Sequence, residues 1–419
     1  MTALPTPPRS ASPSSPRIDA AKLESQPRLS RHRIRSVVMR AGTSKGLFFR
    51  QEDLPEDRAE WHQIITTAMG SPDSYLKQLN GMGGGVSTQS KVAVVGRSSD
   101  PRADVDYTFI QVPIDGGALD FSGNCGNMAS GVGPFAVDEG MVSAKFDGLE
   151  EVTVRILNTN TSKIIHSTFL AEHGYPVEFG ELKLDGVSGS GSPIRLDFVD
   201  PSGSMTGKLL PTGSPTDTIV VPFRGVPTTF TVSCVDAANP FIFVSREALG
   251  LTGDELPAVI QESMTEVLMA IRAEVAVKMG LATSPAAARL VMGTPKIAIV
   301  GPPCAYTTPA GRNVSSDEMD IWVRPFSMGK PHPALQMTGA VCLAAACAVP
   351  GSLVNVIATK SQAARVAAKA PPLLIGHASG TMATDSQASV GEDGTIEVKS
   401  GSVYRTARRL MEGSVLYSK

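Results

Sequence analysis

The sequence predicts a sheet-rich α+β protein in which two similar domains face each other across a cleft. The chain has 419 residues, of which 42% are hydrophobic and 19% charged, enough for two or three domains with buried cores. Its 40 glycines and 31 prolines, with only 5% aromatic residues, favour many tight turns between strands. A similar order of segments in both halves indicates an internal duplication.

The charge balance and the distribution of apolar residues argue against two classes of protein. The 38 lysines and arginines against 40 acidic residues give a net charge of −2, whereas a dedicated nucleic-acid-binding protein carries a strong basic excess. No run of 18 apolar residues predicts a transmembrane helix. We therefore expect neither a nucleic acid nor a membrane as a partner. The five cysteines are scattered and form no CxxC pair, which fits a cytoplasmic protein without a zinc or disulfide framework.

The N-terminal segment differs in composition from the rest of the chain. Residues 1–35 hold seven basic and two acidic side chains, a net charge of +5, so the remainder carries −7. The segment is rich in proline and serine and has no apolar periodicity, which predicts a disordered tail over residues 1–33. An organellar transit peptide stays open, while the missing apolar stretch argues against a secretory signal.

Alternation and helical spacing predict the elements of the first half in order. Its helices are expected at residues 57–69 and, with small apolar residues throughout, at 128–137. Its strands are expected at residues 34–40, 47–49, 91–95, 107–112, 153–157, 164–170 and 194–198. Glycine clusters at residues 80–85 and 121–133 indicate special backbone paths.

The second half repeats this plan in outline. A turn leads into a strand at residues 241–244, a long helix is expected at 257–279, a lysine begins a strand at 296–300, and a small-residue helix follows at 337–346. Further strands are expected at residues 218–223 and 229–234. We therefore expect an N-terminal domain at about residues 34–215 and a C-terminal domain at about 216–419, and this plan allows the chain to cross between the domains near the C-terminus.

Cys125 is the first candidate for chemistry. It lies among glycines in Ser122-Gly123-Asn124-Cys125-Gly126-Asn127, where a helix is expected to begin. Unpaired backbone N–H groups and the helix dipole gather there, which favours a thiolate and binds carboxylates. A glycine loop with an incidental cysteine is the structural alternative.

Two lysines and a histidine are weaker candidates. Lys91 begins an apolar strand, where desolvation suits a base or a carboxylate ligand, although a surface lysine would give the same pattern. Lys45, in the turn Gly42-Thr43-Ser44-Lys45-Gly46, misses the P-loop spacing and indicates carboxylate rather than phosphate binding. His332, between two prolines, is either a base or ligand or a residue that holds its loop. No histidines are paired for a metal, so no metal site is expected.

Four segments resemble the PrpF family. They are MRAGTSKGLFF at residues 39–49, STQSK at 87–91, SGNCGN at 122–127 and MTGAV at 337–341. The resemblance extends from about residue 34 to the C-terminus. It implies the diaminopimelate epimerase-like fold, in which each of two similar domains wraps a barrel-like sheet around a central helix and the active site lies in the cleft between them.

The resemblance also implies site residues. The family's catalytic cysteine corresponds to Cys125 and its catalytic lysine to Lys91, and no cofactor is used. We expect the substrate to contact Ser44, Lys45, Gln89, Asn124, Gly126, Asn127, Lys296, Arg324, Ser327, Met328, Thr338 and Gly339. Related epimerases carry a second cysteine at the start of the second domain's helix. Here Thr338 is expected at that place, which argues against a two-thiol racemase.

The resemblance implies an isomerase of unsaturated di- and tricarboxylic acids. We expect a 1,3-allylic proton shift, with cis-aconitate converted to trans-aconitate as the first candidate. Isomerisation of 2-methylaconitate and tautomerisation of 4-oxalomesaconate remain open, and an amino-acid epimerase or a non-catalytic carboxylate-binding protein are further alternatives. The expected partner is a small polycarboxylate, and a homodimer is possible.

Overall fold

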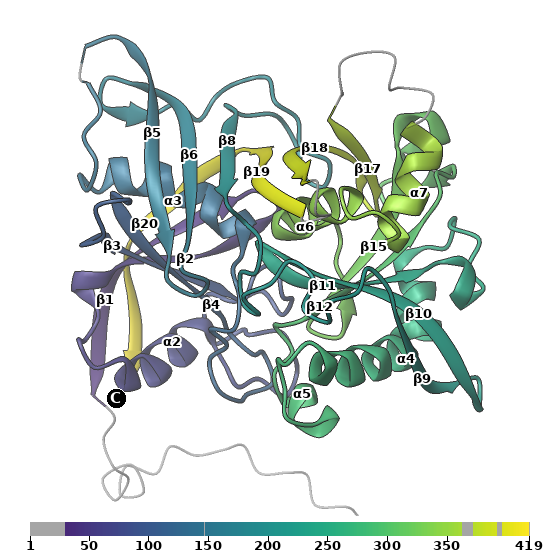
Figure 1. Ribbon diagram of the computed structural model, residues 1–419. Coiled ribbons are helices and arrows are strands. Elements are labelled where there is room, and N and C mark those ends of the chain that lie inside the picture. Colours follow the sequence, from purple (N-terminus) through teal and green to yellow (C-terminus); the bar gives the residue numbers. More distant parts are fainter. Residues whose placement is uncertain (1–29, 146, 363–371, 392–395, 419) are drawn as a thin grey trace, which may run out of the picture.

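The computed structural model describes residues 30–145, 147–362, 372–391 and 396–418. Strands dominate, and 18 of them form one continuous network of pairings (Figure 1). The mixed, sheet-rich fold that the sequence predicts is confirmed. Most of the expected tail, residues 1–29, lies outside the described residues.

The strands form two groups, which one strand connects. The first group contains β1 Arg31–Ala41, β2 Ser44–Arg50, β3 Lys91–Arg97, β4 Val105–Gln111, β5 Leu149–Asn158, β6 Lys163–Glu172, β7 Tyr175–Pro176, β8 Ile194–Val199, β19 Ile396–Arg405 and β20 Ala407–Ser418. The second contains β9 Asp217–Phe223, β10 Val226–Ala237, β11 Asn239–Ser245, β12 Lys296–Gly301, β15 Ile321–Ser327, β16 Lys330–Pro331 and β17 Leu373–His377. Strand β18, Gly380–Val390, pairs with β17 in the second group and with β19 in the first.

Helices and short elements complete the fold. The α-helices are α2 Trp61–Met69, α3 Gly126–Asp138, α4 Pro257–Lys278, α5 Pro285–Leu290, α6 Met337–Cys347 and α7 Leu353–Gln362. Single 3-10 turns are η1 Gln51–Asp53, η2 Arg58–Glu60, η3 Glu247–Leu249 and η4 Ser316–Glu318, and β13 Tyr306–Thr307 pairs with β14 Asn313–Val314. Within the described residues, no helix combines the length and the apolar character needed to cross a membrane.

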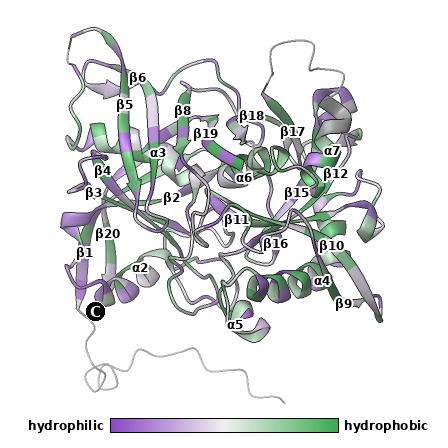
Figure 2. Ribbon diagram, in the orientation of Figure 1, coloured by the Kyte–Doolittle hydropathy of each residue, from purple (hydrophilic) through white to green (hydrophobic). Residues whose placement is uncertain are grey.

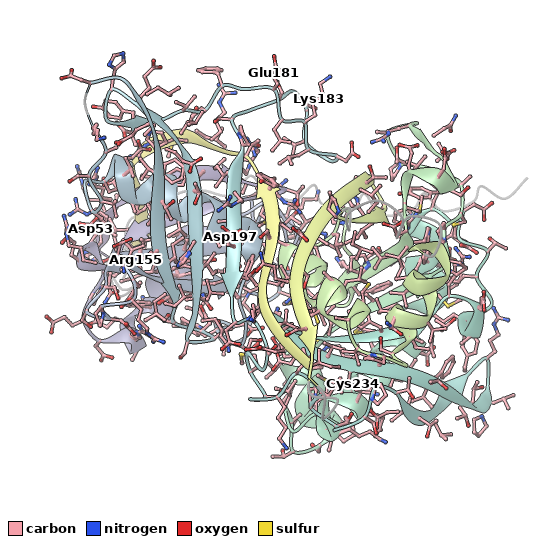
Figure 3. All side chains as sticks on the ribbon, turned by 45° about the horizontal axis from the view of Figure 1, so that its top comes forward. Asp53, Arg155, Glu181, Lys183, Asp197 and Cys234 are labelled. Atoms are coloured by element: carbon pink, nitrogen blue, oxygen red, sulfur yellow. The ribbon has the colours of Figure 1, made fainter. Side chains whose placement is uncertain are left out.

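The end of the chain returns to the first strand group. Strand β19 pairs with β8, and Ser402 of β19 donates a hydrogen bond of 2.7 Å to Asp197 of β8, a residue labelled in Figure 3. Strand β20 pairs with β1 along its whole length. Strand β1 begins at Arg31, so the expected tail over residues 1–33 is too long at its C-terminal end. Residues 31–33 are in a strand because they pair with β20. Local sequence patterns do not reveal a partner so distant in the chain.

Strand β3 is buried on both faces, which explains its continuous apolar run. Val92 and Val94 pack with the core around α2, while Ala93 and Val95 pack with the core that contains α3. Successive side chains of a strand point to opposite faces, so β3 serves two cores at once. It pairs in parallel with β2 and antiparallel with β4.

The second half uses the same arrangement. Strand β12 pairs in parallel with β11 and antiparallel with β15. Ile297 and Ile299 pack with the core around α4, and Ala298 and Val300 pack with the core that contains α3 and α6. Helix α4 carries hydrophilic residues on its outer face (Figure 2), as expected for a helix packed on one side.

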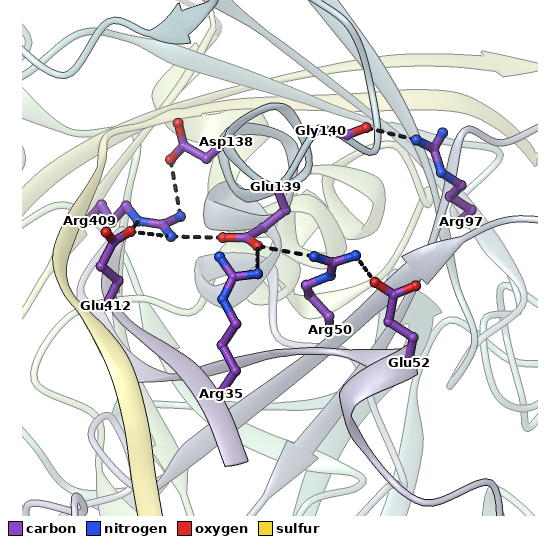
Figure 4. Close-up of polar contacts among 9 residues, drawn as sticks. All are labelled: Arg35, Arg50, Glu52, Arg97, Asp138, Glu139, Gly140, Arg409 and Glu412. Carbon is purple, nitrogen blue, oxygen red and sulfur yellow. Dashed lines mark hydrogen bonds and ion pairs between the residues drawn. The ribbon is translucent and has the colours of Figure 1, made fainter. Parts of the chain in front are cut away.

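The C-terminal end of α3 is fixed by charges. The side chain of Glu139, which follows the helix, is only 1% exposed and pairs with Arg35 of β1 and Arg409 of β20, at 2.7 Å each. Arg50 of β2 lies 3.9 Å from the same carboxylate. Figure 4 shows these arginines around Glu139. Three strands of the first group therefore hold the end of α3 that is opposite Cys125.

Candidate active site

One cavity brings residues of both halves together. Its lining from the first half consists of Ser44, Lys91, Phe109, Gln111, Asp120, Ser122, Gly123, Asn124, Cys125, Gly126 and Asn127. From the second half come Gly293, Lys296, Ser327, Met328, His332, Gln336 and Thr338. The cavity measures about 30 Å³, space for roughly one or two water molecules.

The N-termini of two helices meet at this cavity. Cys125 is the N-cap of α3 and Gln336 is the N-cap of α6. A Cβ atom on Gly126 would lie 2.7 Å from the Cβ of Met337 and 3.4 Å from the backbone nitrogen of Thr338. Glycine at position 126 therefore permits the close approach. Two helix ends with unpaired N–H groups and positive dipole ends favour an anionic ligand between them.

Lys91 is buried at the start of β3. Its Nζ donates to Oε1 of Gln111 at 2.8 Å and lies 4.9 Å from the ring centroid of Phe109. The Nε2 of Gln111 donates in turn to the carbonyls of Ser87 and Ser90. The segment before β3 thus fixes Gln111, and Gln111 fixes the ammonium group.

Lys296 occupies the corresponding position at the start of β12. Its Nζ donates to the carbonyl of Gly293 at 2.8 Å. Burial, together with the charge of Lys91, lowers the pKa of Lys296 to about 8, while Cys125 and Asp120 oppose the shift. At neutral pH, Lys296 is therefore mostly charged and close to its titration range.

A buried arginine positions the loop before Lys296. The guanidinium of Arg272 donates to the carbonyls of Ala288, Thr294 and Pro295. Thr294 also donates through its hydroxyl to the carbonyl of Ser122 at 2.7 Å. The loop of the second half is thereby attached to the loop that precedes Cys125.

Several buried polar atoms around the cavity have no hydrogen-bond partner within the described residues. They are Oγ of Ser44, Oγ of Ser122, Oδ1 of Asn124, Oε1 of Gln336 and Oγ1 of Thr338. Buried polar groups without partners are costly, and proteins rarely retain them without a role. Their gathering at one cavity indicates a polar ligand.

Ten of the fourteen site residues expected from the sequence line this cavity: Ser44, Lys91, Asn124, Cys125, Gly126, Asn127, Lys296, Ser327, Met328 and Thr338. Asn127 holds the turn before Ser44, because its Oδ1 accepts from the backbone N–H of Thr43 and from Nε of Arg405. Its side chain therefore acts mainly on the geometry of the site.

The other four expected residues lie outside the cavity lining. Lys45 follows Ser44 on β2 and so points to the opposite face of the strand. The amide of Gln89 lies against Gly84, and Gly339 lies against the ring of Phe241. The guanidinium carbon of Arg324 stacks 4.4 Å from the rings of both Tyr306 and Trp322.

Sequence reasoning did not select several lining residues. Gln111 reaches Lys91 because the two residues are paired across β3 and β4, a register that the sequence does not reveal. Asp120 belongs to no sequence motif. Its carboxylate accepts a hydrogen bond from the backbone N–H of Ser122. Gln336 stands at the N-cap of α6, so it, and not Thr338 as expected, is the counterpart of Cys125.

Three cysteines outside the cavity lining differ from Cys125 in their surroundings. Burial raises the pKa of Cys234 and of Cys347 to about 12, and raises that of Cys342 further. These thiols stay protonated at neutral pH. Cys125 is partly exposed and lines the cavity. Among the described residues, no group of three histidine, cysteine or acidic side chains is arranged to hold a metal ion.

Comparison with protein families decides the relationship. The model described as "PrpF protein" matches residues 31–418. The chain belongs to the PrpF family. The resemblance noted in the four sequence segments is therefore confirmed over nearly the whole described chain.

Curated relatives match over most of their length. A putative isomerase YraM of Bacillus subtilis is 40% identical, over 90% of this chain and 96% of the relative. A 3-methylitaconate isomerase of Eubacterium barkeri is 39% identical (92% and 98%). A 2-methyl-aconitate isomerase of Shewanella oneidensis is 38% identical (92% and 97%).

Solved structures agree with this relationship. A crystal structure of a methylitaconate-delta-isomerase superimposes with a TM-score of 0.71 at 38% identity, covering 92% of this chain and 96% of the other. A hydroxyproline epimerase from Agrobacterium vitis has a TM-score of 0.54 at 13% identity, covering 92% and 93%. At that low identity, the second match concerns the fold alone.

Proposed function

We propose that this PrpF-family protein is a cofactor-independent isomerase that moves the double bond of an unsaturated tricarboxylic acid by 1,3-allylic proton transfer. The conversion of cis-aconitate to trans-aconitate is the first candidate reaction. The observation that carries the proposal is the meeting of two helix N-termini at a cavity that also holds Lys91, Lys296 and Cys125. The names of the relatives, isomerases of methylitaconate and methylaconitate, support the same class of reaction.

The reaction needs two proton-transfer groups. A base removes a proton from the methylene carbon beside one carboxylate, and the electron pair of the broken C–H bond forms the new double bond. The original double bond then accepts a proton at its far carbon, so that no atom is gained or lost. Lys91 and Cys125 are the proposed groups, because both line the cavity and both side chains can exchange a proton.

The remaining groups suit the charge of the substrate and of the intermediate. The N-termini of α3 and α6 are proposed to bind two carboxylates, and Lys296 to bind a third. The unpartnered hydroxyls of Ser44 and Thr338 supply donors. Such donors, fixed before the reaction, stabilise negative charge that grows in the transition state.

We propose that the two strand groups act as two epimerase-like domains around α3 and α6, with the substrate between them. The cavity of about 30 Å³ is far smaller than the roughly 300 Å³ or more of a typical ligand site. We propose that the two halves move apart to admit the substrate.

The residues of the site bear on three alternative reactions. Isomerisation of 2-methylaconitate and tautomerisation of 4-oxalomesaconate use the same proton shift and the same groups. An amino-acid epimerase needs a second thiol at the start of α6, where this chain has Gln336 and Thr338. The site therefore favours an allylic isomerase over an epimerase.

Proton NMR of the purified protein with cis-aconitate in D2O tests the proposal. We expect signals of trans-aconitate, with deuterium entering the methylene position. The variant Cys125→Ser serves as the negative control. If neither cis-aconitate nor methylaconitate nor oxalomesaconate reacts or exchanges a proton, the proposed function is wrong.

A further inference from the structure

His332 lines the cavity and is not assigned to proton transfer above. It follows β16, lies between two prolines and is only 4% exposed. The backbone N–H of Ala334 donates to its Nδ1 at 3.1 Å. Because Nδ1 accepts this bond, the single proton of the neutral ring is on Nε2.

The surroundings oppose a second proton on the ring. Burial, together with the charges of Lys91 on β3, Lys296 on β12 and Arg405 on β19, lowers the pKa of His332 to about 3. Cys125 and Asp120 line the same cavity, and the net effect still favours the neutral ring. His332 is therefore a neutral group with a fixed N–H donor.

We propose that the Nε2–H of His332 donates a hydrogen bond to a carboxylate of the substrate and to the negative charge that develops there, and that His332 takes no part in proton transfer. The proposal rests on the function proposed above, because it requires a carboxylate substrate. Within the described residues, Nε2 has no hydrogen-bond partner, so the donor is available. A neutral imidazole keeps its proton while stabilising charge, which suits a donor and not an acid.

His377 provides a matched control. It is equally buried, and the backbone N–H of Ser379 donates to its Nδ1 at 3.2 Å. Burial and neighbouring cations lower the pKa of His377 to about 3 as well. His377 does not line the cavity around Cys125. The two histidines share a tautomer and differ in access to the substrate.

The tautomer is tested first, without substrate, by ¹⁵N NMR of the histidine rings, with assignment from the spectra of His332→Gln and His377→Gln. We expect the Nε2–H form of His332 from pH 5 to 8, without titration. An Nδ1–H form, or a titration in that range, would overturn the proposal. Because no turnover is needed, this result is independent of the proposed function.

Activity then separates a donor from a structural residue. A glutamine places its amide nitrogen near the position of Nε2, whereas an asparagine places it near Nδ1. We expect His332→Gln to retain kcat within about 5-fold, and His332→Asn to lose about 10² to 10³-fold, the usual effect of removing one such donor. His377→Gln should leave kcat unchanged. Equal losses in both His332 variants would contradict a donor at Nε2.

A binding measurement covers the case of an enzyme inactive on every acid tried. Propane-1,2,3-tricarboxylate, which cannot isomerise, is titrated into the labelled protein. A downfield shift of the Hε2 proton of His332, without a shift at His377, supports the donor. A bound ligand that leaves His332 unshifted overturns it.

Discussion

The two halves of the site have the same backbone plan but different chemical groups. In each half a lysine begins a strand that pairs in parallel with the preceding one, and a small-residue helix directs its N-terminus at the cavity. In the first half the N-cap is Cys125, and the ammonium of Lys91 is held by the side chain of Gln111. In the second half the N-cap is Gln336, and the ammonium of Lys296 is held by a backbone carbonyl.

The difference indicates that the two halves have different roles in the reaction. Both helix ends provide the field and the N–H groups that an anion needs, and this depends on the backbone alone. Among the described residues that line the cavity, only those of the first half include a thiol, which can carry a proton. We therefore expect loss of Cys125 or Lys91 in the first half to reduce kcat, and loss of Lys296 in the second half mainly to raise KM.

The largest effect is expected from Cys125→Ser. A hydroxyl ionises far less readily than a thiol, so we expect kcat to fall by about 10³-fold, within the usual range for loss of an acid–base group. Steady-state kinetics with the best substrate measures the effect. Cys304→Ser is the matched control, because Cys304 is also partly exposed but contacts Arg246 away from the cavity. Near-normal turnover by Cys125→Ser would remove the thiol from the mechanism.

A lysine pair tests the comparison directly. Lys91→Met should lower kcat by about 10² to 10³-fold because it removes a proton-transfer group. Lys296→Met should mainly raise KM, by about 10- to 100-fold, because it removes an electrostatic contact with the substrate. Steady-state kinetics of each variant gives the change in kcat and the change in KM, and the comparison of these two changes is the test. A similar fall of kcat in both would mean that the two halves share the chemistry.

The titration of Lys296 predicts a smaller, pH-dependent effect. With a pKa of about 8, the ammonium loses its charge as the pH rises through 8, so KM should increase about 10-fold between pH 7 and 9.5. Lys296→Arg should abolish the increase, since arginine stays charged. The shift also acts on stability. The lowered pKa makes the charged lysine unfavourable in the folded state, and this cost decreases as the pH rises from 8 towards 10.5.

Local sequence patterns predicted the helices and strands better than they predicted which segments pack against one another. Lys91 and Cys125 stood out because a lysine that begins an apolar strand and a cysteine among glycines are visible in the sequence. Gln111 and Asp120 enter the cavity through strand register and loop packing, which depend on contacts distant in the chain. His332 was a candidate in the sequence, but local patterns did not decide between a role in the chemistry and a role in its loop. Arg324 was expected to contact the substrate, but its guanidinium packs on two aromatic rings and lies outside the cavity lining.

The smallest effect is expected at the edge where the end of the chain joins the first half. Deletion of residues 1–29 should leave kcat and KM within twofold, because the described site is built from residue 44 onward. Deletion of residues 1–33 also removes the pairing of Arg31–Arg33 with Leu416–Ser418 and the stacking of His32 on Tyr417 at 5.3 Å. Each cross-strand pair contributes about 0.2–1 kcal/mol, so Tm should fall by a few degrees while kcat stays unchanged. Thermal unfolding and kinetics on both deletions separate the two results. A loss of activity on deleting residues 1–29 would mean that this segment contributes to the site.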